Sequence, residues 1–345
     1  MVLASTETLD ADGRITYIDP GEYISDEGAP VCRLPYRRFL PHKVMVKLRI
    51  NVGTYEKLSE FGPEAILFHG TCSWELLCVA RYVREHSNVL FYVDSHEDWY
   101  NSARGFVSRE FLHRRYYGPI LRSVLPTIRK ILCLSTECID FVAEIYRIPK
   151  KHLEFFPLGG HPIGDEEYMQ RREATRRAHG ISNGDVLLLQ SGRQTRLKKL
   201  LDSLRFFAAC PDSAFRLFVV GILQEDIRHE AEALIADDAR VTYLGWKSPD
   251  ELTDLLCAAD IYLQPGTQSV TMQHSLCCRC AVILDDVPSH KVYLRENGWL
   301  INEKHGLPVI FRGIRETDLP TMGANSYAFA SDMLDYKQMS LRILQ

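Results

Sequence analysis

The sequence predicts an α/β protein built on parallel sheets with helices on both faces. Short segments rich in Val, Ile, Leu and Phe alternate with amphipathic helical segments along most of the chain, and this alternation is typical of parallel sheets. The clearest strand segments are apolar at consecutive positions, as strands buried on both faces are. Several of them end at a glycine, where the chain can turn into the next helix.

Residues 186–304 give the strongest pattern. We expect five strands there, at Val186–Gln190, Phe215–Gly221, Arg240–Trp246, Ile261–Gly266 and Ala281–Asp286. Between the third and fourth strands, Ser248 has the features of a helix N-cap, because Pro249 follows at the first helical position and Glu251 comes three residues after the cap.

A basic loop follows the first of these strands. Ser191-Gly192 forms the turn, and Arg193, Arg196, Lys198 and Lys199 crowd the start of the next helix. A helix N-terminus favours anions, and added cations strengthen that preference, so the loop is a candidate phosphate site. A solvated basic helix end is the alternative.

Ligands of parallel sheets bind beyond the carboxyl ends of the strands. Arg193, Trp246 and the loop Pro265–Gln273 all fall at such ends, so we expect them to share one cleft.

The amino-terminal half carries a cluster of histidines and carboxylates. Strand Ala65–Gly70 ends in His69, and strand Val89–Val93 is followed by Asp94, Ser95, His96, Glu97 and Asp98. A histidine flanked by carboxylates is suited to proton transfer, which makes His96 the first candidate and His69 the second. A solvated or structural histidine remains the alternative for each, and the carboxylates could instead bind substrate hydroxyls or cap the next helix.

Composition excludes several classes of protein. The 345 residues, 46% of them hydrophobic, suffice for two domains with cores. A net charge of −4 argues against nucleic acid as a partner. No apolar run approaches the roughly 18 residues of a membrane-spanning helix, no secretion signal is evident, and ten cysteines then indicate reduced thiols in the cytoplasm. We interpret the cluster Cys277, Cys278 and Cys280 as core packing and not as a metal site.

The segment Arg104–Lys130 mixes arginines with aromatic residues, as does Arg33–Ile50. Such a surface could rest on an anionic membrane, at the inner face of the cell membrane for a cytoplasmic protein. A helix packed on the sheet with solvated arginines is the alternative.

The order of motifs resembles GT-B glycosyltransferases, in particular those of glycosyltransferase family 4. The matching stretches are SGRQTRLKK, YLGWKSPDELTDLLCAADIYLQPG, QHSLCCRCAVIL, ENGWLI and the bridge CLSTECIDFVAEIYRIPKKHLEFFPLGG. The resemblance covers residues 60–345. It implies a GT-B fold of two Rossmann-like domains facing across a cleft: residues 1–160 on the acceptor side, residues 161–325 binding the nucleotide-sugar, and a carboxy-terminal helix, 326–345, crossing back.

The same resemblance implies transfer of a sugar from a nucleotide-diphosphate sugar to a sugar or lipid-linked acceptor, with retention of the anomeric configuration and without a metal or cofactor. Arg193 and Lys198 match the residues that hold the diphosphate, His96 with Asp94 would act at the reacting centre, and His69 and Glu97 would face the acceptor. The other expected donor-site residues are Gly192, Trp246, Gly266, Gln268, Ser269, Thr271, Gln273 and His274.

The chain departs from the family pattern at three points. Lys199 replaces a usual glycine, and PGTQSVTMQ lacks the two family glutamates, the second of which would fall on His274. The opening VLAS looks like the second strand of the first domain, so we expect the first strand and helix to be missing and a sheet edge to be uncovered.

Two other functions stay open: a non-catalytic glycosyltransferase-like subunit and a nucleotide-sugar epimerase of the same fold. A Rossmann dehydrogenase is disfavoured, because no G-x-G-x-x-G follows a predicted strand.

Overall fold

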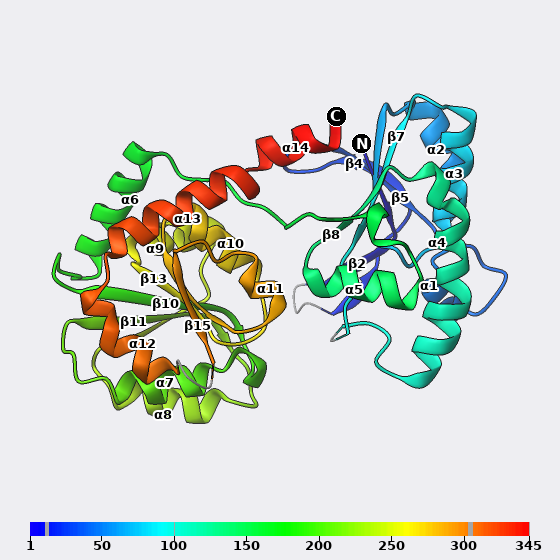
Figure 1. Cartoon of the computed structure of the whole chain (residues 1–345). Coiled ribbons are helices and arrows are strands. Elements are labelled where there is room, and N and C mark those ends of the chain that lie inside the picture. The colour runs from blue at the N-terminus through cyan, green and yellow to red at the C-terminus, as the bar shows by residue number, and fades with distance from the viewer. Residues whose placement is uncertain (11–13, 100, 303–305, 345) are drawn as a thin grey trace. The chain divides into compact units, whose positions relative to one another are not determined.

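The computed structural model describes residues 1–10, 14–99, 101–302 and 306–344 (Figure 1). The chain divides into two compact units, Met1–Phe156 and Pro157–Ile343. Along the described ranges, no helix combines the length and the apolarity that crossing a membrane requires.

The second unit is built on a six-stranded parallel sheet of order β12-β11-β10-β13-β14-β15. Its strands are β10 (Val186–Gln194), β11 (Phe215–Leu223), β12 (Val241–Gly245), β13 (Ile261–Gln264), β14 (Ala281–Asp285) and β15 (Gly298–Ile301). The five predicted strands are confirmed, with β10 extending four residues further than expected, through Gln194. The strand order reverses between β10 and β13, which is where doubly wound sheets bind their ligands.

Helices cover both faces of this sheet, as predicted: α7, α8 and α12 lie on one side in Figure 1, and α9, α10 and α13 on the other. The helices of the unit are α6 (Asp165–Ala178), α7 (Leu200–Ala208), α8 (Arg228–Ala236), α9 (Pro249–Ala258), α10 (Val270–Cys277), α11 (Pro288–Lys291), α12 (Leu307–Gly313), α13 (Leu319–Met333) and α14 (Tyr336–Leu344), with 3-10 turns at Arg196–Lys198 and Ile314–Glu316.

Local signals explain several of these boundaries. The expected cap at Ser248 is confirmed as a capping box, in which Ser248 accepts from the Glu251 N–H and Glu251 accepts from the Ser248 N–H at 2.8 Å. Cys277, Cys278 and Cys280 are buried, as expected for core packing.

Two ion pairs to one buried carboxylate fasten α6 to the sheet. Arg172 and Arg176 of α6 both bind the carboxylate of Asp260, which precedes β13 and also accepts from the Leu187 N–H of β10 at 2.7 Å. The side chains of Arg176 and Asp260 are 8% and 14% exposed.

The first unit contains a four-stranded parallel sheet in sequential order, formed by β6 (Ala65–Phe68), β7 (Leu90–Ser95), β8 (Lys130–Cys133) and β9 (Leu153–Phe155). The prediction that β7 ends at Val93 is wrong. Asp94 and Ser95 still pair with Leu132 and Cys133 of β8, because the ladder continues for two more residues.

Smaller sheets precede this one. β1 (Val2–Ser5) pairs in parallel with β5 (Pro30–Leu34), and β4 (Gly21–Ile24) pairs with β5 in antiparallel fashion. β2 (Glu7–Leu9) and β3 (Ile15–Tyr17) form a separate antiparallel ribbon. The expected parallel sheets are therefore present in both units, and the antiparallel pairs β2–β3 and β4–β5 are additions that the sequence analysis did not predict.

The helices of the first unit are α1 (His42–Leu48), α2 (Thr54–Phe61), α3 (Glu75–Glu85), a π-helix (Ser108–Tyr117), α4 (Gly118–Val124) and α5 (Thr136–Ile145), with 3-10 turns at Leu125–Thr127 and Lys150–His152. Their apolar faces pack on the sheet through a continuous core that includes Leu76, Phe91, Leu121, Ile131 and Phe141.

Candidate functional site

Lys198 lies at the strand-order reversal of the second sheet. Its ammonium group donates to the carbonyl oxygens of Thr267 at 2.6 Å and Gln268 at 3.0 Å. Burial lowers its pKa from 10.5 to about 8, and among the described residues no carboxylate pairs with it. A half-buried cation without a counter-charge is a suitable partner for a bound anion.

Close backbone packing holds the loop that carries Lys198. A Cβ on Gly266 would lie 2.0 Å from the Leu197 carbonyl oxygen, and one on Gly221 would lie 2.0 Å from the Gly192 carbonyl oxygen. Gly192 itself has φ 123°, a conformation that a side chain would strain. Gly192 and Gly266 are therefore required where the ends of β10 and β13 approach each other.

The four basic residues of this loop do not form one cluster at a helix start. Arg193 is still part of β10, and the 3-10 turn Arg196–Lys198 precedes α7. Arg196 donates to the Asp226 carbonyl, and Lys199 binds the Asp285 carboxylate at 2.6 Å. Arg193 is exposed and, within the described ranges, has no carboxylate partner, so Arg193 and Lys198 are the two cations that remain available.

Lys199 adopts φ 52°, in the left-handed region. Glycine takes this conformation most easily, which explains why a glycine is usual at this point of the motif. The lysine keeps the backbone shape and adds an ion pair to β14.

The loop after β13 is ordered by its own side chains. The Gln264 side-chain amide donates to the Thr267 backbone carbonyl, and the Ser269 hydroxyl donates to Gln264 Oε1 at 3.0 Å. The Gln268 side-chain amide donates to the Ser289 backbone carbonyl at 3.1 Å. Ser269 is the N-cap residue of α10 and makes no side-chain cap bond to that helix. The structure thus brings Lys198, Gly266, Gln268 and Ser269 together beside the amino end of α10, where Thr271 is buried in the first turn.

Gln273 and His274 differ in whether their side-chain hydrogen-bonding groups remain available for a ligand. The Gln273 side-chain carbonyl accepts from the Gly159 N–H at 2.9 Å, and its amide donates to the Tyr293 hydroxyl at 3.1 Å. Both ends of the amide are therefore used inside the protein. Burial lowers the pKa of His274, which favours the neutral ring, and the described residues provide no hydrogen-bond partner for it.

Trp246 follows β12, two strands from β10 in the sheet order, and is 72% exposed. A large exposed aromatic ring at the carboxyl end of a parallel strand offers a flat surface for stacking.

In the first unit, Asp94 connects the two candidate histidines. One carboxylate oxygen binds His69 Nδ1, and the other accepts from the Gly70 N–H at 2.8 Å and lies 3.4 Å from His96 Nε2. Burial raises the pKa of Asp94, but the hydrogen bonds from His69 and His96 outweigh it and bring the pKa down to about 2. The hydrogen bond to Asp94 raises the pKa of His69.

Glu97 supports the same loop from the other side. Its buried carboxylate accepts from the Thr71 N–H at 3.2 Å and from the Ser95 hydroxyl at 2.7 Å. Asp94 and Glu97 therefore both hold the loop after β6, a structural role that sequence analysis did not assign to either.

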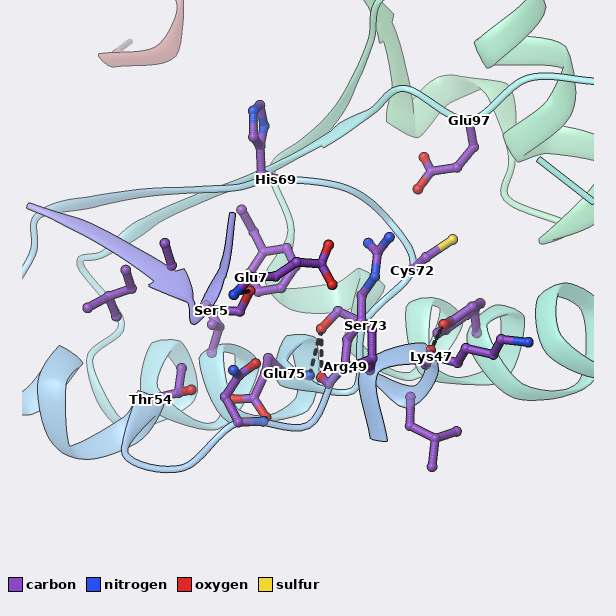
Figure 2. Close-up of a pocket in the computed structure, with 18 of the residues that line it drawn as sticks. Ser5, Glu7, Lys47, Arg49, Thr54, His69, Cys72, Ser73, Glu75 and Glu97 are labelled. Atoms are coloured by element: carbon purple, nitrogen blue, oxygen red, sulfur yellow. Dashed lines mark hydrogen bonds between the residues drawn. The ribbon is translucent and has the colours of Figure 1, made fainter. Parts of the chain in front are cut away.

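A cavity of about 1690 Å³ opens beside this loop, lined by residues of the first unit alone. His69 and Glu97 lie on its wall, and Figure 2 shows His69 pointing away from Arg49 and Glu75. Sequence analysis did not identify Arg49 as a residue of this cavity wall. Its backbone carbonyl accepts from the Ser73 hydroxyl at 3.2 Å. The basic and aromatic character of Arg33–Ile50 was visible in the sequence, but nothing in it showed that this segment forms a cavity wall.

No protein-family model matches the chain. Lipopolysaccharide glucosyltransferase WaaG of Escherichia coli (strain K12) is 27% identical over 175 residues, which are 48% of this chain and 46% of that protein. The match thus spans about half the length of this curated relative.

Solved structures of similar architecture cover nearly the whole chain. Anabaena HepE in complex with UDP is 14% identical with a TM-score of 0.65, over 91% of this chain and 85% of that one. Sucrose-phosphate synthase from Thermosynechococcus elongatus is 15% identical with a TM-score of 0.66, over 99% and 87%. These likenesses confirm the predicted resemblance to GT-B glycosyltransferases and show the fold, with its two Rossmann-like units.

Proposed function

We propose that the chain is a glycosyltransferase that moves a sugar from a nucleotide-diphosphate sugar to a glycan or lipid-linked acceptor in the synthesis of surface glycans. The observation that carries this proposal is Lys198, a half-buried cation at the strand-order reversal with only carbonyl oxygens as partners among the described residues. The similar proteins agree with it: WaaG is a glucosyltransferase, and HepE has been solved with UDP and with UDP-glucose.

In this proposal Lys198 and Arg193 bind the diphosphate of the donor. When the bond to the sugar breaks, negative charge develops on that diphosphate, and fixed cations stabilise it. Because two cations meet the leaving group, we propose that the transfer needs neither a metal ion nor a cofactor. Retention of the anomeric configuration rests on the family resemblance.

The remaining donor contacts follow from the same loop. Gly192 and Gly266 let the backbone approach the phosphates closely, and Gln268, Ser269 and Thr271 at the amino end of α10 would bind phosphate or sugar hydroxyls. His274 is the better candidate for the ribose than Gln273, since the Gln273 amide already has two partners. Trp246 would stack on the base.

We assign His96 and Asp94 to the reacting centre and His69 and Glu97 to the acceptor side. Asp94 keeps both imidazoles oriented, and His96 would face a sugar oxygen at the reacting centre. The cavity beside His69 would receive the acceptor.

We further propose peripheral contact with an anionic membrane on the cytoplasmic side. Phe106 and Val107 are exposed, and so is Phe111, four residues further along the chain. The Arg115 guanidinium lies 4.8 Å from the centre of the Phe111 ring. Exposed apolar side chains beside cations are typical of interfacial binding. Co-sedimentation with vesicles containing anionic lipid should decrease in the double variant Phe106→Ser, Phe111→Ser.

The main test is calorimetric titration of the protein with UDP, GDP, ADP and their common sugars. We expect saturable binding of one nucleotide, lost in Arg193→Ala and Lys198→Ala. Arg196→Ala is the matched control, because Arg196 lies in the same loop but is engaged with Asp226. Absence of binding to every nucleotide would overturn the proposal.

The absence of carboxylates from PGTQSVTMQ favours a second candidate, a non-catalytic subunit of the same fold. It predicts nucleotide binding without turnover for any acceptor. An epimerase would instead convert the donor sugar without an acceptor, which chromatography of the nucleotide-sugars would reveal.

A further inference from the structure

We infer that His69, Asp94 and His96 form a binding site for a divalent cation of the zinc type. This inference goes beyond the proposed function, which uses no metal. Among the described residues, these three are the one group of His, Cys, Asp or Glu whose potential ligand atoms gather closely, within 4.8 Å of one another.

The ligand set is one that zinc prefers. Two imidazoles and one carboxylate supply three protein ligands, and the fourth position of a tetrahedral site stays open for water. Zinc–nitrogen distances of about 2.0–2.1 Å place ligand atoms roughly 3.5 Å from one another. His96 Nε2 already lies 3.4 Å from an Asp94 oxygen, and the widest separation in the group, at most 4.8 Å, must shorten by about 1 Å.

The surroundings permit that movement. Asp94 is 7% exposed and stays in place, because it belongs to β7 and its carboxylate accepts from the Gly70 N–H at 2.8 Å. The two histidines are 77% and 43% exposed and can rotate toward it. Carboxylates that bind a metal ion are themselves usually held by hydrogen bonds, as the Gly70 N–H holds Asp94.

The imidazoles already turn toward the position that the ion would occupy. His69 contacts one carboxylate oxygen of Asp94, His96 lies near the other, and their rings meet edge to face with centroids 4.9 Å apart. Metal binding at this position would replace the contacts that the two imidazoles now make with the Asp94 carboxylate.

Other side chains do not compete well for the ion. Nine of the ten cysteines are buried, and the tenth, Cys78, is half-buried with a pKa that burial raises to about 11. Thiols bind zinc as thiolates, so these residues are poor ligands in the folded protein. Mg²⁺ and Ca²⁺ are disfavoured at the site because they prefer oxygen ligands.

The bound ion would occupy the side chains that the proposed transfer reaction needs. If the proposed function is correct, zinc should inhibit transfer, because His96 and Asp94 could no longer reach the sugar. Zinc binding itself does not depend on that function.

The test is titration of the intact, metal-free protein with Co²⁺, followed by visible absorption, and with Zn²⁺ by calorimetry. We expect one Zn²⁺ per chain, a cobalt spectrum typical of four ligands including nitrogen, and no binding of Mg²⁺. Loss of a partner outside the coordination shell commonly weakens metal affinity 10–100-fold, so losing a ligand in His96→Gln should weaken Zn²⁺ binding by at least about 100-fold.

His229→Gln is the matched control, since His229 is exposed in the second unit, and it should leave zinc affinity unchanged. Asp94→Asn serves as a second variant only if circular dichroism shows a native fold, because Asp94 also supports the loop after β6. Absence of stoichiometric Zn²⁺ binding, or binding that His96→Gln leaves unchanged, would overturn the inference. Nucleotide titration with Arg193→Ala reports on the proposed function separately.

Discussion

Asp94 in the first unit and Lys198 in the second both lie near the carboxyl ends of parallel strands, but their surroundings differ. Asp94 accepts from His69 and from the Gly70 N–H, with His96 close by. Within the described ranges, the Lys198 ammonium group donates only to the carbonyl oxygens of Thr267 and Gln268. Neighbouring groups compensate the charge of Asp94, whereas no described carboxylate pairs with Lys198.

Structural charges and binding charges can be separated on this basis. Removal of a charge that has a complete set of partners leaves those partners unsatisfied and destabilises the fold. A half-buried charge without a counter-charge has been retained at a cost to stability, so its removal should affect ligand binding more than folding.

The largest expected effect comes from Asp260, a fully paired charge of the second unit. In Asp260→Ala, Arg176 would remain buried without its partner, and such a loss costs about 3–5 kcal/mol. Urea unfolding should show this decrease. Asp250→Ala, which removes an 82% exposed partner of Arg171, should cost less than about 1 kcal/mol. Similar losses in both variants would contradict the distinction.

The next effect is on nucleotide affinity and concerns Lys198. A hydrogen bond to a charged group contributes about 1.5–3 kcal/mol, so Lys198→Ala should weaken nucleotide binding by roughly 10–150-fold. The free energy of unfolding should change little or rise, because burial of the ammonium group opposes folding. A variant that unfolds at much lower urea concentration would show that Lys198 is structural.

Asp94→Asn should lower the free energy of unfolding by less than Asp260→Ala does. The pKa of Asp94 is lowered from 3.8 to about 2, which corresponds to about 2 kcal/mol. Since the folded-state pKa is depressed, this stabilisation is present above pH 4 and is lost as the pH falls through 2. The difference between wild type and variant, measured by urea unfolding, should therefore shrink across this window. A difference that is constant with pH would contradict the assignment.

The smallest effect is a pH dependence of donor binding. With a pKa of about 8 in the free protein, Lys198 loses its proton as the pH rises above 8, and the anion then binds only with proton uptake. Nucleotide affinity should fall by up to about tenfold per pH unit above 8. Lys198→Arg should bind with an affinity that stays level over the same range, because arginine remains charged.

Local patterns predicted much of the second unit. The strands around Leu187, Val219 and Ile283 are apolar at consecutive positions because helices cover both faces of the sheet, and the Ser248 capping box is formed by residues three apart. The first unit was less predictable. Its short strands β2, β3 and β4 take part in antiparallel pairs, and β3 and β4 are largely exposed segments with no strong apolar pattern.

The candidate site shows the same division. The sequence identified a basic loop after β10, but it did not distinguish among its cations, nor did it show that the Gln273 amide is occupied by Gly159 and Tyr293.

The fold class, most strands and helices of the second unit, the buried cysteines and the loop that carries Lys198 could be predicted from the sequence, because each depends on residues close together in the chain. Other pairings became visible in the folded chain. Lys199 pairs with Asp285, 86 residues away, while no carboxylate of the described residues pairs with Lys198, and Asp94 meets His69, 25 residues earlier. These partners meet through crossover connections between parallel strands, which fix distances that no local pattern encodes.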